Sequence, residues 1–336
     1  MATLEPPPFA VLAPVLAVAW GLGALSGCAH ENIHGREIEL AEEPYSFGGE
    51  PLSYWRGAPR GLDARALPRA ILLEGDGPQC QAYSEALWRR TVNEWTGDYV
   101  LVRPRTRLST HCEDGSFARL DFAHRVDDLA ALVAALEARS PGTPTYLIGH
   151  SAGAHVAVLY ATREGSRVAG VASLGGGLDE LATVLGAIPH ERLRRGTIDA
   201  NEAETEGLET LRILADVRSH AGSNAPFWGR TYPFWAEMFF SGSKEAWARL
   251  DAPIFVAHGV DDVDSVPFGL VASTVDELKD RGRDVTFVAY TDLGHDLLRS
   301  RVFVDVDRWI TASETKRRGA RGASDAGQGT AQHSPR

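Results

Sequence analysis

Short apolar runs alternate with helical patterns along most of this chain. Residues 70–73 form a continuous apolar run, whereas residues 126–139 repeat Leu, Val and Ala at three- and four-residue spacing. The pattern predicts strands over 70–73, 99–102, 145–148, 168–174, 253–257 and 285–290, and helices over 83–95, 126–139, 151–162, 268–281 and 296–310. Unbroken apolar strands that alternate with helices indicate an α/β protein whose mostly parallel central sheet is covered by helices on both faces.

Three segments depart from this alternation. Residues 38–54 predict two short antiparallel strands broken at Gly48-Gly49. Residues 178–250 hold helical segments and a dense aromatic stretch between two predicted strands, which indicates a helical insertion into the fold. Residues 314–336 are rich in Gly, Ala, Ser, Gln and Arg, and this composition predicts a disordered tail.

The first 27 residues differ in kind from the rest. An apolar stretch over residues 9–25 is followed by small residues, which is typical of a secretory signal. The sequence Leu25-Ser26-Gly27-Cys28 resembles the lipobox of bacterial lipoproteins, in which the Cys becomes the lipid-bearing first residue. This resemblance implies a leader over 1–27 and an exported domain over 28–313 that is periplasmic or at the cell surface and held to a membrane by a lipid on Cys28. An uncleaved membrane anchor is the alternative.

The charge balance bears on the class of partner. The chain has 34 Lys and Arg against 45 Asp and Glu, a formal net charge of −11. Nucleic-acid affinity depends on clustered basic residues, so we expect no nucleic-acid partner.

The three cysteines bear on redox chemistry and metals. If Cys28 carries a lipid, Cys80 and Cys112 remain as a candidate disulfide in an oxidising compartment, the alternative being two unrelated buried thiols. The chain has no CxxC spacing, and we expect no metal site.

The strongest chemical signal is the G-x-S-x-G sequence over 149–153, which reads GHSAG. A predicted strand precedes it and an Ala- and Val-rich helix follows, the setting in which this motif forms a nucleophile elbow. The tight turn requires small residues on both sides of Ser151. It would hold the hydroxyl above the sheet edge, where the helix N-terminus favours developing negative charge.

A serine hydroxyl needs a base to take its proton, and the base needs an acid to orient it. His295 follows the predicted strand 285–290 and fits the role of base. The chain after the preceding strand reads HGVDDVDSVP over 258–267 and offers three candidate acids, Asp261, Asp262 and Asp264. Ser, Asp and His follow one another in the order found in α/β-hydrolases.

With these motifs the sequence resembles the α/β-hydrolase family over about residues 68–310, and within it the dienelactone hydrolases and prolyl-oligopeptidase-like esterases. The resemblance implies the α/β-hydrolase fold and a position for the acid in the pattern H-G-x-x-D-x-x-V-P, which points to Asp262. Here Val266-Pro267 comes one residue later, so Asp264, and less so Asp261, remain rivals.

Two N–H donors are needed to bind an oxyanion. One would be the backbone N–H of Ala152, directly after the serine. The resemblance places the other at Asp76, in the loop after the strand 70–73. Relatives carry a His-Gly pair in this loop, whereas this chain has Glu74-Gly75. We expect the backbone to keep its role and the Glu74 side chain to turn away.

The resemblance also implies that the insertion over 178–250 is a cap over the active site. Its aromatic residues either pack the cap onto the main domain or line an apolar pocket. The candidate pocket residues are Phe227, Trp228, Tyr232 and Trp235.

Together these features predict a serine hydrolase of the carboxylesterase kind, acting on a small acyl substrate through an acyl-enzyme on Ser151, with no cofactor. The alternatives are an amidase or peptidase of the same fold, and a non-catalytic surface binding protein that keeps the hydrolase scaffold.

Overall fold

The computed structural model describes residues 28–75, 81–105 and 122–328. The leader over 1–27, Asp76 of the predicted oxyanion loop, and the two cysteines of the candidate disulfide, Cys80 and Cys112, lie outside the described residues. Cys28 is the first residue of strand β1. Among the helices of the described ranges, none is long and apolar enough to cross a membrane.

The centre of the described structure is a nine-stranded sheet. The strands lie in the order β1 (Cys28–Glu31), β2 (Glu37–Phe47), β3 (Glu50–Pro59), β5 (Val100–Arg105), β4 (Arg69–Leu73), β6 (Thr145–His150), β7 (Gly170–Leu174), β10 (Ile254–Gly259) and β11 (Val285–Tyr290). The pairs β1–β2, β2–β3 and β3–β5 are antiparallel, and the pairs from β5 to β11 are parallel. The predicted mostly parallel sheet is therefore confirmed.

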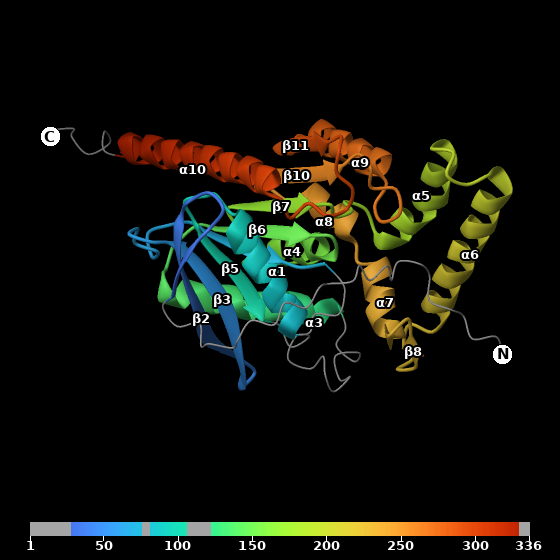
Figure 1. The fold of residues 1–336 in the computed structure, drawn as a ribbon, viewed down its shortest axis with the longest axis horizontal. Helices are drawn as coiled ribbons and strands as arrows, with labels where there is room; N and C mark the ends of the chain where they lie inside the picture. The colour runs from blue at the N-terminus through green and yellow to red at the C-terminus, as the bar shows by residue number, and fades with distance from the viewer. Residues whose placement is uncertain (1–27, 76–80, 106–121, 329–336) are drawn as a thin grey trace, which may run out of the picture.

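Helices cover both faces of this sheet (Figure 1). One face carries α1 (Gln81–Glu94) and α10 (Ser300–Gln328), and the other carries α3 (Phe122–Arg139), α4 (Ala152–Ala161), α8 (Ser243–Arg249) and α9 (Phe268–Asp280). Strand β4 shows why the strands read as continuous apolar runs. Ala70 and Leu72 pack on the α1 and α10 side, while Ile71 and Leu73 pack on the opposite side. Both faces of such a strand are buried, so most of its side chains are apolar, and the buried Arg69 at the start of β4 is paired with Glu137.

The insertion folds as a helical cap between the neighbouring strands β7 and β10. It contains α5 (Leu181–Arg194), α6 (Ala200–Ser219), the small hairpin of β8 (Pro226–Phe227) and β9 (Arg230–Thr231), and α7 (Tyr232–Phe239). Helix α6 begins at a capping box, in which the Asp199 side chain accepts from Glu202 N at 2.9 Å and the Glu202 side chain accepts from Asp199 N at 2.8 Å. In Figure 1 the cap projects at the opposite side of the molecule from the C-terminal end of α10.

The C-terminal helix corrects two predictions. It begins at Ser300 rather than at residue 296, and it continues to Gln328 although residues from 314 onward were predicted to be disordered. A buried contact with the sheet holds the first turn of this extension. The Tyr146 hydroxyl donates to Glu314 Oε1 at 2.8 Å, and both residues are buried. Arg317 pairs with the same carboxylate at 2.6 Å, so the helix is held beyond the limit that composition suggests.

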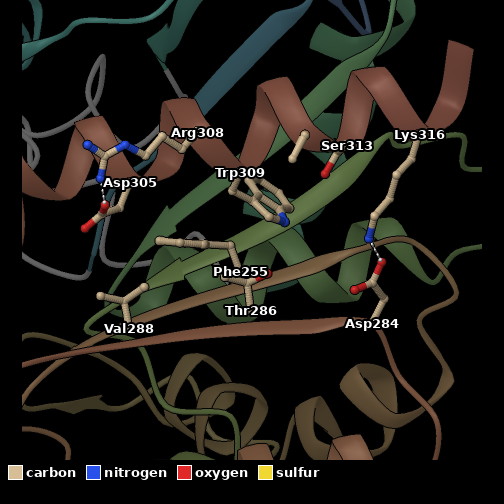
Figure 2. A pocket seen from close by; sticks show the side chains of 10 residues that line it. Phe255, Asp284, Thr286, Val288, Asp305, Arg308, Trp309, Ser313 and Lys316 are labelled. Carbon is tan, nitrogen blue, oxygen red and sulfur yellow. Dashed lines mark hydrogen bonds and ion pairs between the residues drawn. The ribbon is translucent and has the colours of Figure 1, made fainter.

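A cavity of about 320 Å³ lies between strands β10 and β11 and helix α10 (Figure 2). Phe255 and Trp309 contribute much of its apolar wall. Charged side chains at its rim pair with one another, Lys316 with Asp284 at 3.2 Å and Arg308 with Asp305 at 3.0 Å. The residues around this cavity include none of the predicted site residues.

We expect Glu314→Ala to lower the free energy of unfolding by about 1–3 kcal/mol, because it leaves the buried Tyr146 hydroxyl without its acceptor. Urea denaturation followed by circular dichroism measures the change. Thr315→Ala is the matched control, since Thr315 is exposed on the same turn of α10. If both variants unfold at the same urea concentration as the wild type, the end of α10 does not depend on this contact.

Candidate active site

Ser151 occupies the turn between strand β6 and helix α4. Its backbone lies at φ 52° and ψ −125°, a conformation that a residue with a side chain rarely adopts. The Ser151 N–H donates to the Leu174 carbonyl of β7 at 3.0 Å, and its own carbonyl accepts from Ala154 N at 3.0 Å. These bonds to the sheet and to the first turn of α4 hold the strained residue in place.

Glycines let other backbone segments approach this turn. A side chain on Gly153 would collide with the backbone of Leu73 at the end of β4. A Cβ on Gly75 would lie 2.9 Å from Ser151 Cβ. Helix α4 and the loop after β4 can therefore both meet at Ser151 only because neither position carries a side chain.

The structure brings Ser151, His295 and Asp262 into one chain of hydrogen bonds. The Asp262 carboxylate can only accept, so His295 Nδ1–H donates to Asp262 Oδ2, at 2.7 Å. This leaves His295 Nε2 as the acceptor for the Ser151 hydroxyl, at 2.9 Å. The three side chains have the relative geometry of a nucleophile, a base and an orienting acid.

The choice among the three aspartates follows from the loop after β10. Asp262 is 3% exposed, and its Oδ1 accepts the N–H groups of Ser265 and Val266, each at 3.2 Å. The side chains of Asp261 and Asp264 are 59% and 77% exposed and turn away from the imidazole to meet cap arginines. The structure therefore places Asp262, rather than either rival, against His295.

Two neutral histidines support these loops, the partly buried His150 and the fully buried His258. His150 Nε2–H donates to the carbonyl of His295 at 3.2 Å, and His258 Nε2–H donates to the carbonyl of Val266 at 2.8 Å. Burial, and then the neighbouring His295, lower the pKa of His150 to about 4, and burial lowers the pKa of His258. Both rings therefore stay uncharged near neutral pH and act as fixed donors to the backbone.

The first two residues after β4, Glu74 and Gly75, are held by two arginines that no sequence motif singles out. Glu74 forms an ion pair with Arg103 of β5, whose side chain is fully buried and whose pKa burial lowers to about 9. Arg125 of α3 donates to the Glu74 carbonyl and, at 3.5 Å, to that of Gly75. The Glu74 carboxylate is thus paired with a cation, as expected of a side chain turned away. An arginine directly after an apolar run, as Arg103 is after residues 99–102, is the signal that could have revealed this pair.

The predicted oxyanion donors are placed in part. Ala152 is 4% exposed. Because it is the first residue of α4, its N–H has no partner within the helix. Asp76 lies outside the described residues. Its role as the second donor stays a prediction.

The four candidate pocket residues lie together in the cap, where they contact one another. The Phe227 ring stacks on Trp228 and on Tyr232, with centroids 4.6 and 4.9 Å apart. Trp235 Nε1 donates to the Phe227 carbonyl at 2.7 Å, and the Tyr232 hydroxyl donates to Asp216 of α6 at 2.7 Å. These contacts favour packing within the cap, and a role in lining a substrate pocket stays a prediction.

Within the described ranges, no group of three or more His, Cys, Asp or Glu side chains is arranged to hold a metal ion. A family model described as "Alpha/beta hydrolase family" matches residues 105–306. None of the curated proteins matches this chain.

Solved structures share the fold at low sequence identity. A thermostable carboxyl esterase from Bacillus coagulans is 16% identical with a TM-score of 0.55, covering 81% of this chain and 98% of its own. An esterase from Pyrobaculum calidifontis is 16% identical with a TM-score of 0.53, covering 82% of this chain and 83% of its own. An acylaminoacyl peptidase from Pyrococcus horikoshii is 14% identical with a TM-score of 0.53, covering 82% of this chain but only 41% of the peptidase.

We expect the stability of the protein to fall with acidification because of His155, which is 4% exposed on α4. Burial, and then Arg125, lower the pKa of this imidazole from 6.5 to about 4. Between these values the unfolded chain binds a proton that the folded protein does not. The free energy of unfolding therefore falls by up to about 1.4 kcal/mol for each pH unit between 6.5 and about 4, and nothing is lost above 6.5.

The test is urea denaturation of wild type and His155→Leu from pH 7 to pH 4.5. The free energy of unfolding of the variant should fall less steeply with decreasing pH than that of the wild type, and the difference in slope should correspond to close to one bound proton. His34→Leu, at an exposed histidine, is the control. Parallel curves for all three proteins would contradict the assignment.

Proposed function

The chain belongs to the alpha/beta hydrolase family, and we propose that it is a serine hydrolase that cleaves a carboxylic ester or a related acyl bond of a small-molecule substrate. The observation that carries this proposal is the continuous hydrogen-bond chain from Ser151 through His295 to Asp262. A serine hydroxyl is a weak nucleophile on its own. A base that already accepts its hydrogen bond supplies the activation that the reaction needs.

In the proposed reaction, Ser151 Oγ attacks the substrate carbonyl carbon as its proton passes to His295 Nε2. The Asp262 carboxylate stabilises the resulting imidazolium. The tetrahedral intermediate collapses when His295 returns the proton to the leaving alcohol, and this step leaves an acyl group on Ser151. Water, deprotonated by His295, then releases the carboxylic acid and restores the serine. None of these steps needs a cofactor.

The negative charge of the tetrahedral intermediate falls at the N-terminus of α4. The N–H of Ala152 would bind the oxyanion there, with Asp76 N–H as the second donor. The pairing of Glu74 with buried Arg103 supports this arrangement. Without that cation, a carboxylate beside the oxyanion would oppose the developing charge.

An ester is preferred over an amide or peptide as substrate. The chain spans nearly all of the Bacillus coagulans esterase, but only 41% of the acylaminoacyl peptidase. The apolar cluster of the cap suits an apolar acyl group better than a polar peptide.

We also propose that the protein is exported and anchored by a lipid on Cys28. This proposal rests on the apolar leader and on the sequence Leu25-Ser26-Gly27-Cys28. Strand β1 begins at Cys28 and pairs with β2, so an anchor there would be joined to the edge of the sheet without a linker.

We expect a fluorophosphonate probe to label the wild-type protein covalently at Ser151, because the hydroxyl is hydrogen-bonded to its base. Ser151→Ala removes the nucleophile and should abolish labelling while leaving the fold intact. Gel fluorescence and peptide mass spectrometry give the readout. A folded wild-type protein that takes up no label would favour the alternative of a non-catalytic binding protein.

We expect Asp262→Asn to lower kcat for a p-nitrophenyl ester by about 10⁴-fold, because an amide at this position favours the wrong histidine tautomer. Asp264→Asn should cost less than about fivefold, since an exposed ion pair contributes at most about 1 kcal/mol. Steady-state kinetics distinguish the two. A larger loss at Asp264 than at Asp262 would reverse the assignment of the acid.

A further inference from the structure

The end of cap helix α5 contacts the loop that carries Asp262, here called the acid loop (residues 260–266). Arg195 Nη2 donates to the carbonyl of Val260, and Arg195 Nη1 lies 3.6 Å from Asp261 Oδ1. These contacts fall on the two residues directly before Asp262. The guanidinium thus binds the outer side of the acid loop at its backbone and at a side chain.

The guanidinium of Arg195 is itself fixed from within the cap. Its Nε donates to Glu191 Oε1 at 2.7 Å, and the Glu191 side chain is 8% exposed. Hydrogen bonds from Arg194 and then Arg195 lower the pKa of Glu191 to about 2. The carboxylate therefore stays ionised over the working pH range and holds Arg195 in one orientation.

A second cap arginine meets the other side of the acid loop. Arg192 Nε lies 3.6 Å from Asp264 Oδ1, and Arg192 Nη1 donates to Glu206 of α6 at 2.6 Å. The two aspartates that flank Asp262 thus face cap arginines, while Asp262 itself turns inward to His295. The extra residue between Asp262 and Val266-Pro267 belongs to the segment that presents Asp264 outward.

The inner side of the acid loop is held by the main domain. Asp262 N–H donates to the Gly259 carbonyl at 3.2 Å, and Asp261 N–H donates to the Leu293 carbonyl at 3.0 Å. His258 binds the far end of the loop at the Val266 carbonyl. The Val260 carbonyl, by contrast, accepts from a cap side chain.

We propose that Arg195 is a positioning residue for the triad acid, assisted by Arg192, so that the cap supports the geometry of catalysis. The inference rests on the proposed hydrolase function. Loss of the Arg195 contacts would release the backbone directly before Asp262 and let its carboxylate move away from His295 Nδ1. The acid orients His295 and stabilises the imidazolium, and neither role binds the substrate, so the loss falls on kcat rather than on KM.

The test compares Arg195→Gln with Arg194→Gln. Arg194 is the matched control, because it is the same residue type at the next position and pairs with the same Glu191, while its side chain is 67% exposed. Arg195→Lys keeps the charge but lacks the planar fork that reaches Val260 and Asp261 together, so it should be intermediate. The first readout is kcat and KM for a p-nitrophenyl ester. The second is hydrogen–deuterium exchange of the peptide over 258–268, which does not depend on catalysis.

We expect Arg195→Gln to lower kcat by about ten- to a hundredfold with KM within about twofold of wild type. Exchange of the acid-loop amides, which include the N–H groups bound by Asp262, should be faster in this variant and unchanged in Arg194→Gln. Arg195→Lys should keep part of the wild-type kcat and part of the wild-type protection of the acid-loop amides from exchange. A change in KM alone would assign Arg195 to cap closure and overturn the inference.

The outcomes also separate the inference from the proposed function. If the wild type takes up no fluorophosphonate, the proposed function fails together with the catalytic consequence of Arg195. Exchange still reports whether Arg195 holds the loop. If the wild type is active and Arg195→Gln matches Arg194→Gln in kcat and in exchange, the inference is overturned and the proposed function stands. If Arg195→Gln does not fold, Arg195→Lys and Asp261→Asn decide the matter by the same two measurements.

Discussion

The arrangement of the site depends on one strained residue. Ser151 has a positive φ between a buried strand and a helix, a conformation that costs about 1–3 kcal/mol and persists only where the surroundings enforce it. Strand β7 and the first turn of α4 enforce it by hydrogen bonds, and the close approach of β4 at Gly153 leaves the turn no room to relax. Strand β6 leads into Ser151, and its two neighbours in the sheet, β4 and β7, contact the turn from either side.

Each loop that meets at Ser151 is braced by an arginine from another element. Arg125 of α3 holds the loop after β4, and Arg195 at the end of α5 holds the acid loop. Arg90 of α1 pairs with Asp296, directly after His295, at 2.9 Å and donates to the Leu298 carbonyl at 3.0 Å. A guanidinium suits this task because its several fixed donors can bind a backbone carbonyl and a carboxylate together. The described residues of these loops, which follow the carboxyl ends of the strands, are therefore tied to helices on both faces of the sheet and to the cap.

The sequence is informative where the determinant is local. Apolar runs and helical spacing were sufficient to predict the parallel sheet, and local patterns singled out Ser151 and His295, which the structure brings within a hydrogen bond. The sequence is silent where the determinant is a distant contact. Glu314 ties α10 to the sheet by accepting a hydrogen bond from Tyr146, 168 residues earlier in the chain, and no composition rule contains that contact. Likewise, the sequence left three aspartates as candidates for the acid, and only the path of the loop backbone shows which of them faces His295.

The cap leaves the sheet after β7 and returns before β10, two strands that lie side by side. An insertion closed across adjacent strands can change in length and sequence over evolution without altering the register of the sheet, as surface connections commonly do. The arginines at the end of α5 limit that freedom. A lineage that exchanged this cap for another would also remove the arginine that holds the outer side of its acid loop. A new cap can therefore change the substrate range only if it keeps an equivalent of the end of α5.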